Sequence, residues 1–423
     1  MSAVGVVGAG YVGLTTAACL AHLGHRVTCV DIDKSKVDDL GRGEVRIAEP
    51  GLPELVRAGL EGGELGFTTD LEPLRDTTVV LLCLPTPRAA DGDADTRVVD
   101  AVLDRLEDLL PAGAVVVTKS TVPVGTAAAI GRRGLRAVSN PEFLREGHAV
   151  EDFLNPDRIV IGSADEAAGD AVAALYRRLV APVVRTDPAS AELAKYASNA
   201  FLATKLSYVN GLAQLCERLG ADVTEVTRTM GLDARIGPDF LAPGPGWGGS
   251  CLPKDTSALL RAAAGAGVEF DVLRAAVRTN ERQGERVAAA VREAVGGPLS
   301  GARVGLLGLA FKAGTGDLRD SPALAVAAKL ADGGAVLTGY DPAVDPAELD
   351  GSRVQVTDDP YLVAKDAEAL VVLTDWPQFR DLDWARMAAL AERAVVVDTR
   401  NLLDPALLRA RGFRRYGTGT RPE

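Results

Sequence analysis

The pattern of apolar positions divides the chain into three parts with different periods. In the first part, short apolar runs alternate with segments of helical period, which predicts strands of a parallel sheet connected by helices such as Val98–Leu110. The expected strands are Val4–Val7, Val27–Val30, Thr78–Pro85, Ala114–Ser120, Leu135–Asn140, Arg158–Gly162 and Pro182–Thr186.

The pattern changes at Asp187, where a helical run continues to Gly220. Asp187 suits an N-cap, Pro188 suits the first helical position, and Gly220 suits the end. The run is too long for a crossover helix, so we expect a connecting helix that opens a middle, mainly helical domain.

A second alternating pattern starts at Gly301 with ARVGLLGLAF, a helical SPALAVAAKLADGG, and the runs VLTGYDP, ALVVLTDW and AVVVDTR. We therefore predict an α/β protein with two Rossmann-like doubly wound domains and a central helical domain with its long connecting helix. The expected boundaries are 1–187, 188–297 and 298–423.

A glycine motif lies between the first strand and the first helix. Gly8, Gly10 and Gly13 form GxGxxG, and Asp31 ends the next strand. In this context the glycines let the backbone approach a pyrophosphate at a helix N-terminus, and the carboxylate binds the ribose hydroxyls. This predicts NAD rather than NADP; the alternative is a plain tight turn. The second α/β part has Gly305 and Gly308 but no full motif, so we expect it to bind another ligand.

A cysteine lies on a glycine-rich turn in GGSCLPKD, residues 248–255. The turn makes Cys251 accessible, Lys254 favours a thiolate if the two groups meet, and Asp255 could move a proton or fix a water. Beside a dinucleotide site, such a cysteine suggests aldehyde oxidation through a thiohemiacetal and a thioester. The alternative is a structural loop in which Cys251 has no chemical role.

Other polar residues fall where such chemistry would need them. Lys195 and Asn199 are four residues apart on the long helix and could stabilise an oxyanion; the alternative is a solvated helix start. Glu142 and Glu146 in NPEFLREG follow a strand, and one could act as a base. Thr121 ends another strand and could position a water. A loop or surface position remains the alternative for each of these three.

Composition limits the class of protein. A net charge of -12 over 423 residues argues against a nucleic-acid binder. The five cysteines have no CxxC or zinc-like spacing, so no metal is expected and a reducing, cytoplasmic compartment fits. No uninterrupted apolar run reaches the about 18–20 residues of a membrane helix, so no membrane partner is expected.

Taken together, these motifs resemble the UDP-glucose 6-dehydrogenase/GDP-mannose dehydrogenase family over essentially the whole chain. The resemblance rests on GAGYVGL, KSTVPVGT, NPEFLREG, ELAKYASNAF, RIG, GGSCLPKD, GLAFKAGTGDLRDSP and DTRN in family order. It implies oxidation of the C6 alcohol of a nucleotide-sugar to the carboxylate with two NAD+, and a homodimer formed through the central helices.

The resemblance also implies site roles. Cys251 matches the nucleophile, Lys195 and Asn199 the pair that holds the C6 oxygen, and Asp255, with a water near Thr121, the proton-handling group. Glu142 and Glu146 match the loop carboxylates, one of which serves thioester hydrolysis. The implied cofactor contacts are Gly8, Gly10, Tyr11, Val12, Gly13, Asp31, Pro85, Thr86, Thr121, Lys254 and Arg319, and the further substrate contacts are Phe143, Leu144, Arg235 (across the dimer), Gly248, Lys312 and Arg400.

One departure concerns the nucleotide. Some UDP-glucose enzymes have a lysine after RIG, whereas this chain reads RIGPDFLAPGPGWGG with Ala242. UDP-glucose is the expected substrate, with dTDP-glucose and GDP-mannose as alternatives. Two further hypotheses are a two-electron 6-phosphogluconate or 3-hydroxyacid dehydrogenase, which needs no thiol, and a catalytically idle nucleotide-sugar binding protein, which would not need Cys251, Lys195, Asn199 and Asp255 together.

Overall fold

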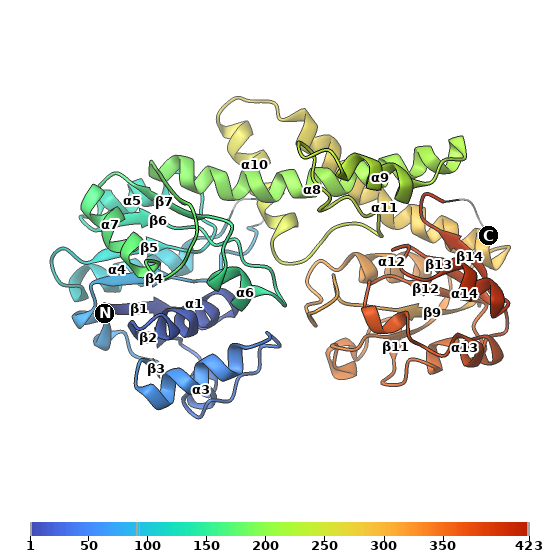
Figure 1. Ribbon diagram of the computed structural model, residues 1–423, viewed down its shortest axis with the longest axis horizontal. Coiled ribbons are helices and arrows are strands. Elements are labelled where there is room, and N and C mark those ends of the chain that lie inside the picture. Colours follow the sequence, from blue (N-terminus) through green and yellow to red (C-terminus); the bar gives the residue numbers. More distant parts are fainter. Residues whose placement is uncertain (1, 90–91, 93, 421–423) are drawn as a thin grey trace. The chain divides into compact units, whose positions relative to one another are not determined.

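A computed structural model describes residues 2–89, 92 and 94–420 of the chain (Figure 1). The ends of the predicted first and third domains, residues 1 and 421–423, lie outside this range. The chain forms two compact units: one comprises the residues up to 198 together with 257–268, and the other comprises 199–256 and the residues from 269 onward. The division into three domains at residues 187 and 297 stays a prediction.

The first unit contains an eight-stranded sheet of order β3-β2-β1-β4-β5-β6-β7-β8. Its strands are valine-rich and short, as buried strands of a doubly wound sheet usually are. They span β1 Ala3–Val7, β2 Arg26–Val30, β3 Leu65–Thr68, β4 Val79–Leu82, β5 Val115–Thr118, β6 Arg136–Ser139, β7 Ile159–Ser163 and β8 Val183–Thr186. All seven expected strands are confirmed, and the edge strand β3, which has only a short apolar pattern, was not predicted.

One expectation about this sheet is wrong. The sequence pattern suggested parallel strands throughout, but β7 runs antiparallel to β6, and β8 then runs parallel to β7. The segment between β6 and β7 contains only the short helix α6 (Ala149–Leu154), which packs on α1 (Tyr11–His22). The chain therefore enters β7 at the same edge of the sheet at which it left β6, and β7 runs in the opposite direction to β6.

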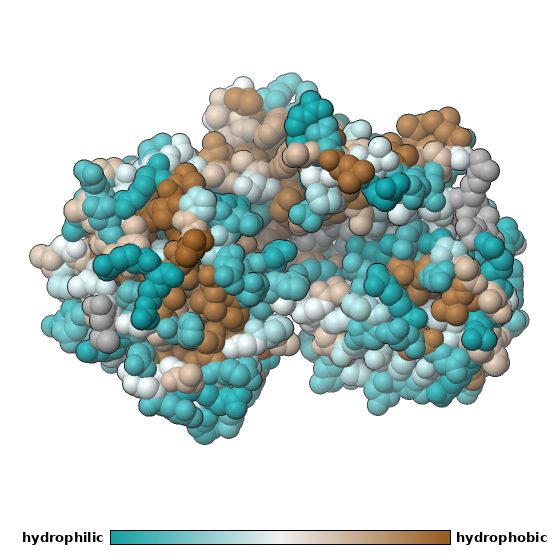
Figure 2. All heavy atoms as spheres, in the orientation of Figure 1, coloured by the Kyte–Doolittle hydropathy of each residue, from teal (hydrophilic) through white to brown (hydrophobic). Residues whose placement is uncertain are grey.

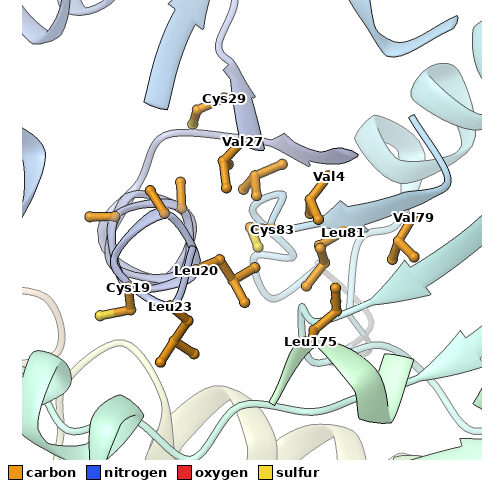
Figure 3. Close-up of a cluster of buried hydrophobic side chains, with 14 of the residues drawn as sticks. Val4, Cys19, Leu20, Leu23, Val27, Cys29, Val79, Leu81, Cys83 and Leu175 are labelled. Carbon is orange, nitrogen blue, oxygen red and sulfur yellow. The ribbon is translucent and has the colours of Figure 1, made fainter. Parts of the chain in front are cut away.

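Helices cover both faces of this sheet. One face holds α1, α2 (Lys34–Gly41), α3 (Leu52–Gly62), α6 and α7 (Glu166–Leu175). The other holds η1 (Glu72–Asp76), α4 (Arg97–Leu109) and α5 (Thr126–Arg132). In Figure 3, Leu20 of α1 and Leu23, the residue that caps its C-terminus, lie in one cluster with Val4, Val79 and Leu81 of the strands and with Leu175 of α7.

The second unit contains a six-stranded parallel sheet of order β11-β10-β9-β12-β13-β14. The strands are β9 Arg303–Leu307, β10 Val336–Tyr340, β11 Val354–Val356, β12 Ala369–Val372, β13 Val395–Asp398 and β14 Arg414–Gly417. α11 (Asp271–Val295) and α12 (Pro322–Asp332) pack on one face. The other face carries η3 (Leu362–Ala364), η4 (Pro377–Phe379), α13 (Trp384–Leu390) and α14 (Pro405–Ala410); η2 (Pro346–Leu349) precedes β11.

The helical segment between the sheets begins with the predicted long helix. α8 spans Pro188–Leu219, and the Asp187 carboxylate accepts the N–H of Ser190 at 2.9 Å, so the expected cap and length are confirmed. α9 (Val223–Gly231) and α10 (Leu252–Gly265) follow before α11. Among the described residues, no helix combines the length and the apolar character that crossing a bilayer requires.

A substitution in the core of the first sheet tests this packing. Leu81→Ala removes a side chain with 0% exposure at the centre of the sheet and leaves a cavity, so we expect the free energy of unfolding to fall by about 2–5 kcal/mol. Urea denaturation measures the change. Ile32→Ala, at a side chain with 95% exposure, is the control and should stay within about 0.5 kcal/mol of the parent. Equal effects of the two changes would contradict the assigned core.

Candidate active site

The glycine loop after β1 has the geometry of a dinucleotide cradle. Gly8 has φ +100°, and a Cβ there would lie 2.4 Å from the carbonyl oxygen of Cys83. A Cβ on Gly13 would lie 1.8 Å from the Gly8 oxygen, so α1 packs directly on the loop. Gly10, by contrast, is exposed, with no atom within 4 Å of its would-be Cβ. That open position at the N-terminus of α1, which Val12 also flanks, suits a pyrophosphate.

Two side chains beside the loop fit the same ligand. The Asp31 carboxylate follows β2, accepts the N–H of Ala9 at 2.8 Å and pairs with Lys36 at 3.1 Å. Burial alone would raise the pKa of Asp31, but the N–H groups of Asp33 and Ala9 and the Lys36 ammonium hold it below its ordinary value. The buried Tyr11 hydroxyl has no hydrogen-bond partner among the described residues, and burial raises its pKa together with nearby carboxylates, Glu49 first among them.

The loops after β4 and β5 are held together at the carboxyl edge of the sheet. The Thr86 hydroxyl donates to the Thr121 carbonyl at 2.8 Å, and the Ser120 hydroxyl donates to Leu84 O at 2.7 Å. The predicted residues Pro85, Thr86 and Thr121 are thus neighbours, as expected for loops that follow adjacent parallel strands.

A buried ion pair joins the loop after β6 to α8. Lys195 Nζ lies 2.9 Å from Glu142 Oε1, with side-chain exposures of 5% and 7%. Burial raises the pKa of Glu142, but the Lys195 ammonium, the Leu144 N–H at 2.6 Å and the Lys119 charge together hold it below its ordinary value. The Phe143 ring lies against the Arg158 guanidinium, 3.7 Å from ring centroid to Cζ, and 5.3 Å from Lys195 Nζ. Glu142 is therefore committed to a structural ion pair, whereas Glu146 on the same loop is partly exposed.

Sequence reasoning missed two carboxylates that shape these loops. Glu192, one turn before Lys195, accepts the N–H groups of Gly125 and Ala127 at 2.6 and 2.8 Å. Glu49 accepts those of Gly147 and Ala149 at 2.8 and 2.6 Å. The i, i+3 spacing of Glu192 and Lys195 was the available signal for the first, whereas Glu49 lies about a hundred residues from its partners in the chain.

The cysteine lies at the start of α10 and is exposed, whereas Cys19, Cys29, Cys83 and Cys216 are buried as predicted. The Cys251 carbonyl accepts the Asp255 N–H at 2.9 Å, so Cys251 is the residue before the first helical turn. Asp255 is fully buried and accepts Asn199 Nδ2 and Lys254 Nζ, each at 2.6 Å. Lys254 therefore neutralises Asp255, a different partner from the thiol considered in the sequence analysis.

The first two strands of the C-terminal sheet are followed by a glycine and an aspartate, as in the N-terminal sheet, but here the aspartate is buried. Gly308 follows β9 with φ +95°, and Asp341 follows β10, as Gly8 and Asp31 follow β1 and β2. The Asp341 carboxylate, however, accepts the N–H groups of Leu309 and Ala310 and the Trp376 indole at 2.8–3.1 Å and is 5% exposed. The Asp341 carboxylate is therefore occupied by donors of its own chain, in line with the expectation of a different ligand.

Polar residues gather at the carboxyl edge of this second sheet. The Arg400 guanidinium donates to Leu373 O at 2.9 Å, and its backbone N–H donates to Asp398, which is buried with Arg415 as an ion pair at 3.2 Å. Lys312 Nζ lies 5.9 Å from the Phe311 ring centroid, and Arg319 pairs with Asp317 at 2.6 Å. The Asp398–Arg415 pair, which sequence reasoning did not find, fixes the backbone that carries Arg400.

Two further predicted substrate contacts lie in the second unit. Gly248 is buried, and a Cβ there would lie 1.9 Å from Asp320 O, so no other residue fits. The Arg235 guanidinium forms three hydrogen bonds to the Asp233 carboxylate, the shortest 2.6 Å, and the arginine side chain is 89% exposed.

The buried Lys195–Glu142 ion pair predicts how the stability of the fold should depend on pH. Because the folded pKa of Glu142 is lowered, the pair stabilises the fold above the ordinary carboxyl pKa, and this contribution is lost as pH falls through the lowered value. Lys195→Met leaves a buried carboxylate without its cation, so we expect a loss of about 3–5 kcal/mol in the free energy of unfolding near neutral pH. The loss should shrink in mild acid, where the unpaired Glu142 takes up a proton.

Urea denaturation of this variant at several pH values measures both effects. The double variant Lys195→Met/Glu142→Leu removes both charges and is the control; it should recover much of the lost stability at neutral pH. A single variant whose loss does not depend on pH would contradict a charged Glu142.

Three models of one protein family match successive parts of the chain. Residues 2–180 match the UDP-glucose/GDP-mannose dehydrogenase family, NAD binding domain; residues 189–282 match its central domain and residues 305–405 its UDP binding domain. The UDP-glucose 6-dehydrogenase of Rhizobium meliloti is 43% identical and aligns over 99% of both chains.

Two solved structures show the same architecture. A UDP-glucose dehydrogenase from Pyrobaculum islandicum is 39% identical, with a TM-score of 0.89 over 95% of both chains. A UDP-D-ManNAc dehydrogenase from Pyrococcus horikoshii is 29% identical, with a TM-score of 0.88 over 99% of both chains. The chain belongs to the UDP-glucose/GDP-mannose dehydrogenase family, and it is an NAD-dependent dehydrogenase whose N-terminal sheet carries that family's cofactor-binding domain.

Proposed function

We propose that this enzyme oxidises the C6 alcohol of UDP-glucose to the carboxylate of UDP-glucuronate in two successive two-electron steps. The observation that carries the proposal is an exposed Cys251 four residues before the buried Asp255, whose carboxylate is bound to Asn199 and Lys254. A two-electron alcohol dehydrogenase has no use for such a thiol. UDP-glucose is chosen because the relatives at about 40% identity carry that substrate in their names.

In the first oxidation, the chain's own residues hold the C6 oxygen and move its proton. Lys195 and Asn199 lie one turn apart on α8 and donate to that oxygen. Asp255 receives the hydroxyl proton through a water that the Thr121 loop positions. Bound NAD+ would accept the hydride that C6 loses in each oxidation.

In the second oxidation, Cys251 prevents loss of the aldehyde. The thiolate adds to the aldehyde carbon, and the resulting thiohemiacetal loses a hydride to give a thioester. The N–H groups of the first turn of α10 favour the thiolate electrostatically. Water then cleaves the thioester, releasing the carboxylate and the thiol. Glu146 is the better base for this step because Glu142 is bound to Lys195.

The remaining predicted residues bind ligands in this scheme. Tyr11, Val12, Pro85, Thr86, Lys254 and Arg319 line the cofactor path, while Phe143, Leu144, Gly248, Lys312 and Arg400 hold the sugar and the diphosphate. The Arg400 guanidinium suits a phosphate because its position is fixed by Leu373 O and by the backbone bond to Asp398. dTDP-glucose and GDP-mannose remain the alternative substrates because Ala242 stands where some UDP-glucose enzymes have lysine.

We also propose a homodimer, formed through α8, in a reducing cytoplasm that keeps Cys251 a thiol. Phe201, Tyr208, Leu215 and Leu219 are 51–73% exposed. At 100° per residue they fall within about 40° of one another around the helix, so they form one apolar stripe. Figure 2 shows apolar surface over the α8–α9 region. A second copy of the stripe would bury it, and the exposed Arg235 would reach the partner's substrate.

The catalytic proposal is tested by counting NADH per sugar with UDP-glucose, dTDP-glucose and GDP-mannose in parallel. We expect two NADH per UDP-glucose and slower turnover of the others. Cys251→Ala should bind NAD with unchanged affinity, measured by fluorescence quenching, and lose turnover by at least about a thousandfold because no thioester forms. Steady turnover of the variant, or one NADH per sugar in the parent, would rule out the cysteine mechanism.

The dimer is tested by light scattering coupled to size exclusion. Tyr208→Glu places a charge in the middle of the stripe, so we expect the mass to fall from two chains to one at micromolar concentration. Val336→Glu, at a 56% exposed apolar side chain away from the stripe, is the matched control and should leave the mass unchanged. A monomeric parent protein would refute the dimer.

A further inference from the structure

Two helices each direct a pair of polar side chains, three residues apart, at the loop that leads to Cys251. Ser207 and Asn210 lie on α8, and Asn280 and Gln283 lie on α11. Their targets, Gly244 and Trp247, are also three residues apart. Ser207, Asn210 and Gln283 are 1–3% exposed, so these are polar groups within the protein interior. We call the four side chains the loop clamp.

The clamp binds both polar groups of Gly244. The Gly244 N–H donates to Asn210 Oδ1 at 2.9 Å, and Gln283 Nε2 donates to the Gly244 carbonyl at 2.7 Å. One side-chain amide comes from each helix, so the backbone of Gly244 is bound by both α8 and α11.

The clamp also binds both polar groups of Trp247. The Trp247 N–H donates to Asn280 Oδ1 at 2.8 Å, and Asn280 Nδ2 donates to the Trp247 carbonyl at 2.9 Å. The single amide of Asn280 thus pairs with this residue as a neighbouring strand would. The Trp247 indole donates to Ser207 Oγ at 2.8 Å, and Ser207 donates to Ala276 O at 2.7 Å.

The opposite side of the loop has no free space. A Cβ on Gly248 would lie 1.9 Å from Asp320 O, and one on Gly249, which has φ +78°, would lie 2.7 Å from the Phe311 ring. The loop is therefore fixed between the clamp and the segment 311–322, with Cys251 two residues beyond Gly249.

Gly244 has a different functional neighbour. A Cβ on Gly244 would lie 2.9 Å from Nη1 of Arg400, so the guanidinium lies directly on this part of the backbone. The Gln283–Gly244 bond therefore fixes the backbone against which the Arg400 guanidinium packs. The Asn280–Trp247 pair lies instead at the cysteine end of the loop.

We propose that the loop clamp is a set of positioning residues with divided roles: Asn280 sets the position of Cys251 for attack on C6, and Gln283 sets the position of Arg400 for the nucleotide diphosphate. The proposal rests on the proposed function, because the roles of Cys251 and Arg400 belong to it. A displacement of about 1 Å at a reacting group can cost up to about a hundredfold in rate. A similar shift at a charged binding group weakens a charge-assisted hydrogen bond.

The test compares two variants that each remove one amide. Asn280→Leu is expected to lower kcat about 10–100-fold with less than about a threefold change in the KM for UDP-glucose. Gln283→Leu is expected to raise that KM about 5–20-fold with kcat within about threefold of the parent. The rate of Cys251 alkylation by iodoacetamide, followed by peptide mass spectrometry, should change in the first variant and not in the second.

Val287→Ala is the matched control. Val287 lies on α11 one turn after Gln283, is 5% exposed, and packs in the core of the C-terminal sheet. Its loss of buried methyl groups should lower the melting temperature while kcat, KM and alkylation rate stay within about twofold of the parent. If leucine at 280 prevents folding, Asn280→Asp keeps the side-chain volume and the bond from the Trp247 N–H, and a reduced kcat with unchanged KM is expected.

The possible results distinguish a failure of the loop-clamp proposal from a failure of the proposed function. Asn280 and Gln283 variants that change kcat and KM in the same proportion, or a Val287→Ala enzyme with equal losses, would show that the clamp serves only stability and overturn the proposal. A parent enzyme that fails to produce two NADH per sugar would instead refute the proposed function. The alkylation rates, which need no substrate, would still report whether Asn280 positions Cys251.

Discussion

The structure depends on the need to satisfy the buried polar groups along one face of α8. At 100° per residue, Glu192, Lys195, Asn199, Ser207 and Asn210 lie within about 60° on either side of a common direction around the helix. Each binds a segment outside α8: Gly125 and Ala127, Glu142, Asp255, Trp247 and Gly244, respectively. A buried polar group left without a hydrogen bond there would cost about 1–3 kcal/mol or more in stability. Each contacted segment is therefore held in the position that pairs the polar side chain of α8.

The opposite face of the same helix is apolar and exposed, which inverts the usual amphipathic arrangement. The polar face is bound by its own chain's loops, and the stripe of Phe201, Tyr208, Leu215 and Leu219 is left to the solvent within one chain. One rigid element can thus organise the chemistry on one side and present an association surface on the other.

The two sheets show how one topology serves two kinds of ligand. In both, a glycine with positive φ follows the first strand and an aspartate follows the second. Asp31 stays partly accessible beside the open Gly10, whereas the buried Asp341 carboxylate accepts three backbone N–H groups and the Trp376 indole. At the carboxyl edge of the second sheet, the buried Asp398–Arg415 pair instead fixes the backbone of Arg400, the residue that we propose for the diphosphate.

The sequence alone determined the alternation of strands and helices in both sheets apart from strands such as β3, the cap and length of α8, the glycine-rich turn followed by Asp31, and the accessibility of Cys251. These features depend on local period, on glycine geometry and on spacing within one helix, which short segments encode. Only the tertiary structure decided the antiparallel direction of β7, the pairing of Lys254 with Asp255 rather than with the thiol, and the closure of Asp341. It also revealed Glu49, Glu192 and the loop clamp. Asp341, Glu49, Glu192 and the loop clamp bind backbone groups that distant segments bring to them, and no local pattern records those partners. The direction of β7 depends on the path of the connection from β6, and the choice of Lys254 between carboxylate and thiol depends on how the side chains pack around Asp255.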